Sequence, residues 1–321
     1  MSCPSRYLVP HYVCPSRLEH LGEAVLAAVA FGASGAVPGA VSVSIPMRQL
    51  GSPHHEVWMA RREPERGAHG GVEFAHDGEL LFGTFASNGA SDIEPVTRDA
   101  YTAALMAARA TGYPNLLRMW NHVGSINVPE EGLERYRRFC AGRYDAFAAA
   151  GYELGSDLPS ASAVGMDGRG LITYFIAARA AGVQVENPRQ VSAYRYPPEY
   201  GPRSPSFSRA TVLSEDANSV VYVAGTSSVV GHASTNAGDL AGQVEETIRN
   251  LEIVVSASLP GATLRDVVAV KTYIRHGRDF EAVARILTPA LSPSCQQLFL
   301  EADICRSELL VEIEAVACRA R

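Results

Sequence analysis

Cysteine is scarce in this sequence, and no cysteines are arranged as in a metal or redox site. The six cysteines, at positions 3, 14, 140, 295, 305 and 318 of 321 residues, form no CxxC pair. In a chain of this length, scattered cysteines are typical of free thiols in a reducing compartment, not of a disulfide framework or a zinc site. We therefore expect free thiols and a cytoplasmic protein.

Other absences exclude several function classes. No apolar run reaches the roughly 18 residues that a membrane span needs, and the N-terminus lacks the layout of a signal peptide. The net charge of −6 gives no basic footprint for nucleic acid. Walker, GxGxxG, GxSxG and HExxH motifs are missing. We expect no nucleotide cofactor, no metal and no acyl-serine chemistry.

The chain does contain enough apolar sequence for two packed domains. It is 47% hydrophobic and 19% charged, and 321 residues exceed the usual size of one domain. The first half predicts strands at 79–85, 116–123 and 171–178, helices at 97–111 and 129–150, and a loop at 61–78. The second half predicts strands at 220–224, 267–274, 297–302 and 308–316, a helix that Asp239 caps and that runs to about 258, and a helix at 280–287.

Both halves therefore follow the order strand–helix–strand–helix–strand. A Gly-Thr pair stands at matching places in the two halves, at Gly83-Thr84 and at Gly225-Thr226, and the second pair predicts a turn behind the strand 220–224. Such units usually bury one face of a sheet under their helices. The pattern predicts an α+β sandwich of two similar domains.

A proline-rich segment at 186–209 separates the halves. It contains five prolines, three tyrosines and four arginines. Because proline fixes φ and lacks an amide donor, we expect a stiff, extended connector with neither a helix interior nor a central strand. Tyrosine and arginine suit a ligand that carries carboxylates. An ordinary linker with solvated arginines explains the composition equally well.

The second half resembles the Rid/YjgF fold. The matching elements are the Gly-Thr pair, the helix QVEETIRNLEIVV, the strand VVAVKTYI and the terminal VEIEAVA. The resemblance implies two Rid-like (chorismate-mutase-like) domains, 1–185 and 210–321, each a mixed sheet covered by helices on one face. Rid proteins are trimers with carboxylate-binding pockets between subunits. A tandem chain could form that pocket between its own halves, with the connector 186–209 contributing, as a monomer or a homotrimer.

Longer motifs in sequence order resemble the chorismatases: WNHVGSIN, LERYRRFCAGRYDAF, ENPRQVSAYRYPPEYGPRSPSFSRA, AGTSSVVGHAS, QVEETIRN and ADICRSELLVEIEAV. This resemblance covers nearly the whole chain. It implies an enzyme that splits chorismate into pyruvate and a six-membered-ring carboxylic acid for bacterial secondary metabolism. Chorismate is then the expected small-molecule partner.

Glu312 is the expected catalytic acid. In VEIEAV, Glu312 and Glu314 point to the same side of a strand, and unaided sequence favours solvated carboxylates there. The resemblance implies instead that Glu312 faces the pocket and protonates the methylene carbon of the enolpyruvyl ether. That step needs a general acid with a raised pKa. We expect Glu314 to be structural.

Chorismate carries two carboxylates, so cationic and hydroxyl donors are expected around it. We expect Arg203 and Arg143 to hold the carboxylates, and Tyr194 and Tyr200 to donate to their oxygens. A salt bridge with an acidic residue of its own helix is the ordinary alternative for Arg143.

Four further residues are candidates for the same site. Gly225 and Thr226 predict a turn where backbone can approach a ligand, or a plain turn that ends a strand. A lone cysteine such as Cys305 is more often a small buried hydrophobe. The resemblance instead groups it with chorismatases that form 3-hydroxybenzoate through an arene oxide. Ser227 lies where the family varies among very small residues, which leaves a hydrolase giving the dihydrodiol as an alternative.

Two alternatives of other classes stay open at the level of sequence. A Rid-type imine deaminase carries an arginine fifteen residues before the motif glutamate, and Gln297 occupies that position here. A non-catalytic module that binds small acids would not need Glu312 or Cys305. Release of pyruvate from chorismate separates these possibilities.

Overall fold

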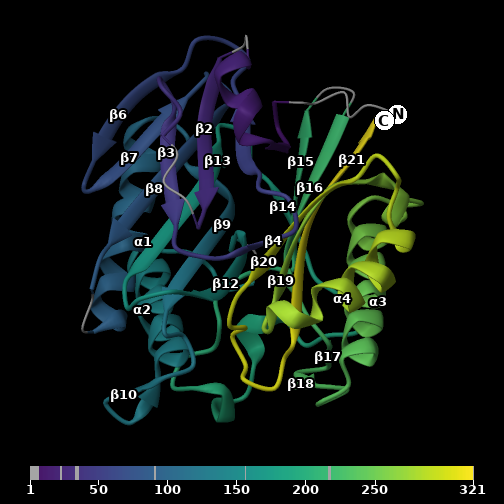
Figure 1. Cartoon of the computed structure of the whole chain (residues 1–321). Helices are drawn as coiled ribbons and strands as arrows, with labels where there is room; N and C mark the ends of the chain where they lie inside the picture. The colour runs from purple at the N-terminus through teal and green to yellow at the C-terminus, as the bar shows by residue number, and fades with distance from the viewer. Residues whose placement is uncertain are drawn as a thin grey trace.

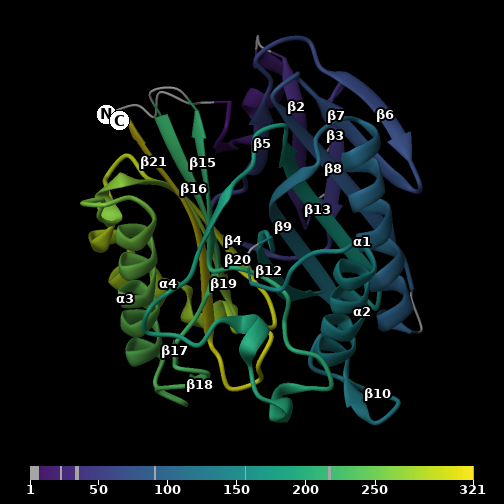
Figure 2. The same cartoon turned by 180° about the vertical axis from the view of Figure 1, so that it is seen from behind.

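Two β-sheets lie face to face in the centre of the molecule, and helices cover the outer side of each (Figures 1 and 2). The computed structural model describes residues 7–21, 24–32, 36–89, 92–155, 157–215 and 218–320. One apolar core fills the space between the sheets and includes Trp120 and Tyr174 from one sheet and Tyr222 and Tyr273 from the other. Each sheet also shares a second apolar core with the helices that cover its outer face.

The N-terminal half forms a six-stranded sheet in the order β12-β9-β13-β8-β7-β6. Helices α1 (Ile93–Ala110) and α2 (Arg135–Ala149) cover its outer face, and Asp92 caps α1 through the Glu94 amide. The strands are β6 (Glu65–His69), β7 (Val72–His76), β8 (Leu80–Ser87), β9 (Asn115–Gly124), β12 (Ser160–Met166) and β13 (Leu171–Ala178); β10 (Pro129–Glu130) and β11 (Leu133–Glu134) form a separate hairpin.

The C-terminal half forms a seven-stranded sheet in the order β14-β15-β16-β21-β19-β20-β4, covered by α3 (Leu240–Ser258) and α4 (Phe280–Leu287). Asp239 caps α3 by accepting a hydrogen bond from the Gly242 amide. The strands are β4 (Gln49–Leu50), β14 (Val183–Val185), β15 (Ala210–Glu215), β16 (Asn218–Thr226), β19 (Val267–Ile274), β20 (Gln296–Glu301) and β21 (Val311–Ala320), with β17 (Val229–Val230) and β18 (Ala233–Ser234) in a hairpin of their own.

A third, smaller sheet lies beside the two large ones. Its order is β1-β5-β2-β3, from β1 (Pro10–Val13), β2 (Val25–Phe31), β3 (Val41–Ile45) and β5 (His55–Met59). Trp58 on β5 reaches the core between the large sheets, whereas Val57 and Met59 belong to a separate cluster on the other side. The strand therefore also carries Glu56, two residues before Trp58, into the interior.

The predicted fold class is confirmed. Strands β12-β9-β13-β8 repeat the order of β20-β19-β21-β16, so both halves are a mixed sheet with helices on one face. Four elements begin and end where the sequence predicts: β13, β19, α3 and α4. The connector forms no strand or α-helix and contains only two short 3-10 turns, at Ala193–Arg195 and Pro198–Tyr200. Strands β4 and β14 precede the connector in the sequence, yet both pair with the C-terminal sheet.

Several predicted boundaries are wrong for local reasons. The helix expected to begin at Pro129 begins at Arg135, because Glu131 and Gly132 have φ values of 51° and 82° and close the β10–β11 hairpin. The loop expected at 61–78 contains the β6–β7 hairpin, in which Gly70 and Gly71 supply the left-handed turn. Helix α1 begins at Ile93, four residues earlier than predicted, because Asp92 provides its cap.

The turn predicted at Gly225-Thr226 is wrong, and both Gly-Thr pairs belong to strands. Gly83 and Thr84 lie within β8, and Gly225 and Thr226 complete β16, beside an irregularity in its pairing with β21 between Val223 and Thr226. Glycine serves here for close approach, since a Cβ at Gly225 would lie 2.0 Å from Glu312 Oε1.

The expectation of free thiols is wrong at one position. Cys14, Cys140, Cys295 and Cys305 are free, but Cys318 is disulfide-bonded. Cys3 lies outside the described residues.

Within the described residues, no helix is long and apolar enough to cross a membrane.

Candidate active site

A cavity lies between the two halves, where the end of β16 and the start of β21 meet β12, α2 and the connector. The empty space within its walls is about 530 Å³, part of it open to solvent. Its walls come from α2, β12, the connector, β16, the loop before β21 and β21 itself. The lining residues are Tyr136, Arg143, Ala161, Ser162, Ala163, Tyr196, Phe207, Arg209, Gly225, Ser227, Val229, Cys305, Arg306, Leu309 and Glu312.

Glu312 is a buried carboxyl group in the wall of this cavity. It lies against Gly225, and Cys305 Sγ is 4.0 Å from its Oε2. Among the described residues, no lysine or arginine lies within ion-pair distance of Glu312. Burial, and secondly the charge of Glu314, raise its pKa to about 8. Glu312 therefore keeps its proton at neutral pH.

Glu314 lies on the same face of β21 but has the opposite environment. Its carboxylate accepts hydrogen bonds from Arg118 Nη2 (2.7 Å), Trp120 Nε1 (2.8 Å) and Ser162 Oγ (2.6 Å), and Lys271 Nζ lies 2.9 Å away. Burial alone would raise its pKa, but Lys271 and Arg118 outweigh burial and lower it to about 2. The expectation that these carboxylates are solvated is wrong, since both are buried.

Four buried charged residues form what we call the charge cluster: Glu56, Arg118, Lys271 and Glu314. Lys271 Nζ lies 2.5 Å from Glu56 Oε2 and donates to Tyr174 Oη at 2.8 Å. Trp58 Nε1 also donates to Glu56, at 2.9 Å. The cluster joins the small sheet to both large ones and contains two positive and two negative groups.

Three arginines surround the cavity. Arg143 on α2 is buried against the rings of Phe139 and Phe207. Arg209, at the end of the connector, donates to Tyr196 Oη at 2.7 Å. The Nε atoms of Arg143 and Arg209 are buried and have no hydrogen-bond partner among the described residues. Each leaves a donor for a ligand oxygen, because buried donors are otherwise satisfied.

Arg306 ties the cavity wall to the connector. Its guanidinium lies 4.3 Å from the ring centre of Tyr200 and 5.4 Å from that of Tyr196. It also donates to the His232 carbonyl oxygen at 2.9 Å and to Ser234 Oγ at 3.1 Å. Tyr200 Oη lies 3.0 Å from His232 Nδ1. These contacts hold the connector against the β17–β18 hairpin.

The structure brings five of the predicted site residues to the cavity wall and leaves four outside it. Glu312, Cys305, Arg143, Gly225 and Ser227 line the cavity. Arg143 makes no salt bridge with its helix among the described residues. Burial and the neighbouring Glu312 raise the pKa of Cys305, so its thiol stays protonated.

Four other predicted residues do not line it. The side chain of Arg203 is 52% exposed, lies 3.7 Å from Asp145 and stacks over Tyr144. Tyr194 packs beside Gly155, and Tyr200 faces His232 and Arg306. Thr226 Oγ1 donates to the carbonyl of Ala224.

Sequence reasoning missed Arg209, Arg306, Ser162 and every member of the charge cluster except Glu314. A signal for the cluster was available, because Lys271 is the single lysine of the sequence and stands in the otherwise apolar strand VVAVKTYI. Arg209 and Arg306 had no such signal. Their positions depend on how the connector and the loop before β21 fold back over the sheets.

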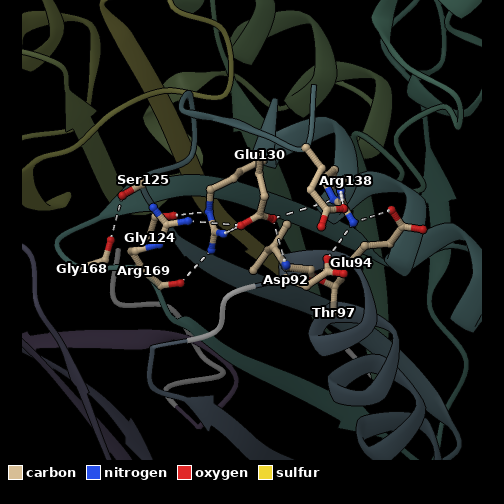
Figure 3. A network of polar contacts seen from close by, with 12 residues as sticks. Asp92, Glu94, Thr97, Gly124, Ser125, Glu130, Arg138, Gly168 and Arg169 are labelled. Carbon is tan, nitrogen blue, oxygen red and sulfur yellow. Dashed lines mark hydrogen bonds and ion pairs between the residues drawn. The ribbon is translucent and has the colours of Figure 1, made fainter. Parts of the chain in front are cut away.

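A separate network of charges lies where α1 and α2 begin (Figure 3). Buried Arg135 pairs with buried Glu130, and Arg138 pairs with Asp92 at 2.8 Å. None of these residues lines the cavity. Their contacts tie the β10–β11 hairpin to the start of α1, so the network supports the fold.

The fold and the site define an α+β protein of two tandem sheet-and-helix domains, with a protonated carboxyl group in a cavity between them. A family model described as "Chorismatase FkbO/Hyg5-like, N-terminal" matches residues 56–177, and one described as "Endoribonuclease L-PSP" matches residues 203–319. The 3-hydroxybenzoate synthase of Streptomyces hygroscopicus is 40% identical over 277 residues, which are 82% of this chain and 81% of that protein. This chain belongs to the chorismatase family.

Two further comparisons agree. A chorismatase of Streptomyces rapamycinicus is 40% identical over 272 residues, covering 81% of both proteins. A chorismatase crystal structure superposes with a TM-score of 0.90 at 31% identity, covering 96% of this chain and 97% of that one. The relationship therefore includes both halves and their arrangement.

Proposed function

We propose that this protein is an enzyme that cleaves chorismate into pyruvate and 3-hydroxybenzoate. Membership of the chorismatase family, with a 3-hydroxybenzoate synthase among its relatives, supports the reaction. The observation that carries the mechanism is Glu312, a buried and protonated carboxyl group in a cavity whose cations are arginines.

The arginines provide for a substrate with two negative charges. Arg143, Arg209 and Arg306 supply three positive charges, and Glu312 adds none while it is protonated. The unpartnered Nε donors of Arg143 and Arg209 bind carboxylate oxygens, and Tyr196 and Tyr136 supply hydroxyl groups at the wall. Hydrogen bonds to an ionised acceptor are roughly twice as strong as neutral ones. This assignment gives Arg209 and Arg306 the part that the sequence predicted for Arg203.

Glu312 begins the reaction by transferring its proton to the methylene carbon of the enolpyruvyl ether. The former double bond supplies the electron pair for the new C–H bond, which leaves an oxocarbenium ion. The arginine-bound carboxylates keep negative charge near this cation and stabilise it. A bound substrate also raises the pKa of Glu312 further, because its carboxylates are like charges to the glutamate anion.

The neighbouring ring hydroxyl then displaces pyruvate. Its oxygen attacks the ring carbon that bears the ether, the bond from that carbon to the ether oxygen breaks, and the electrons form the ketone of pyruvate. The hydroxyl proton returns to the Glu312 carboxylate. The resulting arene oxide opens and rearranges to the phenol. No water is consumed, and chorismate equals the sum of the two products.

Incubation of the purified protein with chorismate tests this proposal. Coupled detection of pyruvate measures cleavage, and chromatography of the ring product against 3-hydroxybenzoate, 4-hydroxybenzoate and the dihydrodiol identifies the route. We expect equal amounts of pyruvate and 3-hydroxybenzoate. Pyruvate with the dihydrodiol would replace the arene oxide by hydrolysis, and no pyruvate above the Glu312→Gln background would overturn the proposal.

A further inference from the structure

Glu314 lies directly behind Glu312, away from the cavity. The two side chains share a face of β21, and Ile313 between them points into the helix-covered core. Alternate residues of a strand are about 7 Å apart. Both carboxyl groups are buried, so little water separates them. A charge on one therefore acts strongly on the other.

Glu314 is held in its ionised form. Arg118, Trp120 and Ser162 donate hydrogen bonds to its oxygens, and the Lys271 ammonium lies 2.9 Å from Oε1. These donors occupy both oxygens, so protonation of Glu314 would disrupt the charge cluster. Ser162 also lines the cavity, and it accepts a hydrogen bond from Arg118 while donating to Glu314.

The other groups that face Glu312 come from several elements. Cys305 and Arg306 belong to the loop before β21, Arg143 and Tyr136 to α2, Arg209 and Tyr196 to the connector, Tyr273 to β19 and Arg118 to β9. The cations among them that weaken proton binding are Arg118, which is bound to Glu314, and Arg209, which is bound to Tyr196. No cation pairs directly with Glu312 among the residues that the structure describes.

We propose that Glu314 is a positioning residue whose permanent negative charge keeps the reactive proton on Glu312 and draws that proton back after each turnover. The inference rests on the proposed function, in which Glu312 must be protonated when substrate binds. Glu314 does not touch the cavity, so it acts through Glu312 and Ser162.

The test is the pH dependence of kcat/KM for pyruvate release in the wild type and in Glu314→Gln. A general acid is active below its pKa, so activity falls on the alkaline side. We expect Glu314→Gln to move the alkaline limb down by about one pH unit, because the unpaired charges of Arg118 and Lys271 then favour the Glu312 anion. An alkaline limb at the wild-type pH would overturn the inference.

Glu56→Gln is the matched control. It removes the other buried carboxylate that pairs with Lys271, so it disturbs the same cluster and leaves the same excess of positive charge. Glu56 is on the small sheet, with Lys271 between it and Glu314. We expect the alkaline limb to move less than half as far as in Glu314→Gln. Equal movement in both variants would show a general effect of the cluster and would also overturn the inference.

A direct titration separates failure of this inference from failure of the proposed function. The ¹³C signal of the Glu312 carboxyl, assigned by its loss in Glu312→Gln, reports its protonation without any substrate. Labelling with ¹⁵N-lysine gives one side-chain signal, from Lys271, which checks that the cluster stays assembled. A downward shift of the Glu312 titration in Glu314→Gln supports the inference even if chorismate is not cleaved.

A second pair of variants avoids the unbalanced charge. Lys271→Met and Lys271→Met/Glu314→Gln differ only in the charge of Glu314. We expect the Glu312 titration to lie at lower pH in the double variant than in Lys271→Met. Identical Glu312 titrations in these two variants would overturn the inference, as would an alkaline limb of kcat/KM that does not move in Glu314→Gln.

Discussion

The cavity and the charge cluster lie side by side between the same two sheets, yet they prepare two similar carboxyl groups for opposite states. Glu312 has no lysine or arginine within ion-pair distance in the described part of the chain, it opens to the cavity, and burial keeps it protonated. Glu314 has Arg118 and Lys271 as partners and stays ionised. Burial is common to both, so the partners decide which carboxyl group can give up a proton in the reaction.

The two halves of the molecule also differ in the side chains that their equivalent central strands place between the sheets. Strand β13 in the N-terminal half corresponds to β21, and it places Ile172, Tyr174 and Ile176 in the core between the sheets. Strand β21 places Glu312 and Glu314 on its equivalent face. The repeated fold therefore gives one apolar wall and one acidic wall, and α2 and β12 of the first half complete the cavity.

Removal of the acid should have the largest effect. Glu312→Gln keeps the shape of the side chain but has no proton to transfer to carbon. We expect kcat for pyruvate release to fall by about 10²- to 10⁴-fold, with chorismate binding retained. Steady-state kinetics and a binding titration with chorismate check both parts. Turnover close to that of the wild type would remove Glu312 from its role.

Loss of the cation of the charge cluster should damage stability. Lys271→Met leaves Glu56 and Glu314 buried without the ammonium that both contact. We expect the free energy of unfolding at pH 7 to fall by about 3–5 kcal/mol, as measured by urea denaturation. Exposed Arg203→Ala is the control, with a change of at most about 0.5 kcal/mol. An unchanged midpoint for Lys271→Met would show that the cluster does not stabilise the fold.

The two glutamates should affect stability with opposite dependence on pH. The folded-state pKa of Glu312 is raised to about 8, so its contribution is present below its ordinary pKa and lost as pH rises through 8. Glu312→Gln should therefore gain on the wild type between about pH 5 and pH 8, by on the order of 2–4 kcal/mol. Chemical denaturation at the two pH values measures the gain.

Glu314 supplies the opposite case. Its folded-state pKa is lowered to about 2, so its stabilisation is present above its ordinary pKa and lost as pH falls through 2. The deficit of Glu314→Gln relative to the wild type should therefore shrink on acidification. Parallel pH dependence in the two variants would contradict the contrast between the two sites.

The sequence could predict the elements whose signals are local. The cap at Asp239, the apolar face of α3 and the β-branched strand 267–274 specify their own boundaries. The hairpins at 65–76 and 129–134 were not predicted, because a glycine indicates a turn but does not show which segments pair across it. Strand β12 was not predicted either. Its sequence SASAVGM consists mostly of small residues, and its burial in the folded protein decides its structure.

The candidate site likewise contains features that the sequence can predict and features that depend on the tertiary fold. The alternation of β21 places Glu312 and Glu314 on one face, which a sequence can show. Which of them is paired depends on Arg118 and Lys271, which lie 196 and 43 positions away in the sequence and meet Glu314 only through the tertiary fold. The same limit explains why Arg203 was chosen from the connector and Arg209 was not. Both are arginines of the same proline-rich connector, and only the path of the chain separates them.

The smallest effect should distinguish those two arginines. Arg209 is buried in the cavity wall, and its Nε donor has no hydrogen-bond partner among the residues that the structure describes, whereas Arg203 is half exposed beside Asp145. If Arg209 binds a carboxylate of chorismate, Arg209→Ala removes a charged hydrogen bond worth about 1.5–3 kcal/mol. KM should rise by roughly 10- to 100-fold while kcat changes less. Arg203→Ala should leave KM within about twofold, because a solvated ion pair contributes little. The reverse result would return the carboxylate site to Arg203 and would mean that the connector moves when substrate binds.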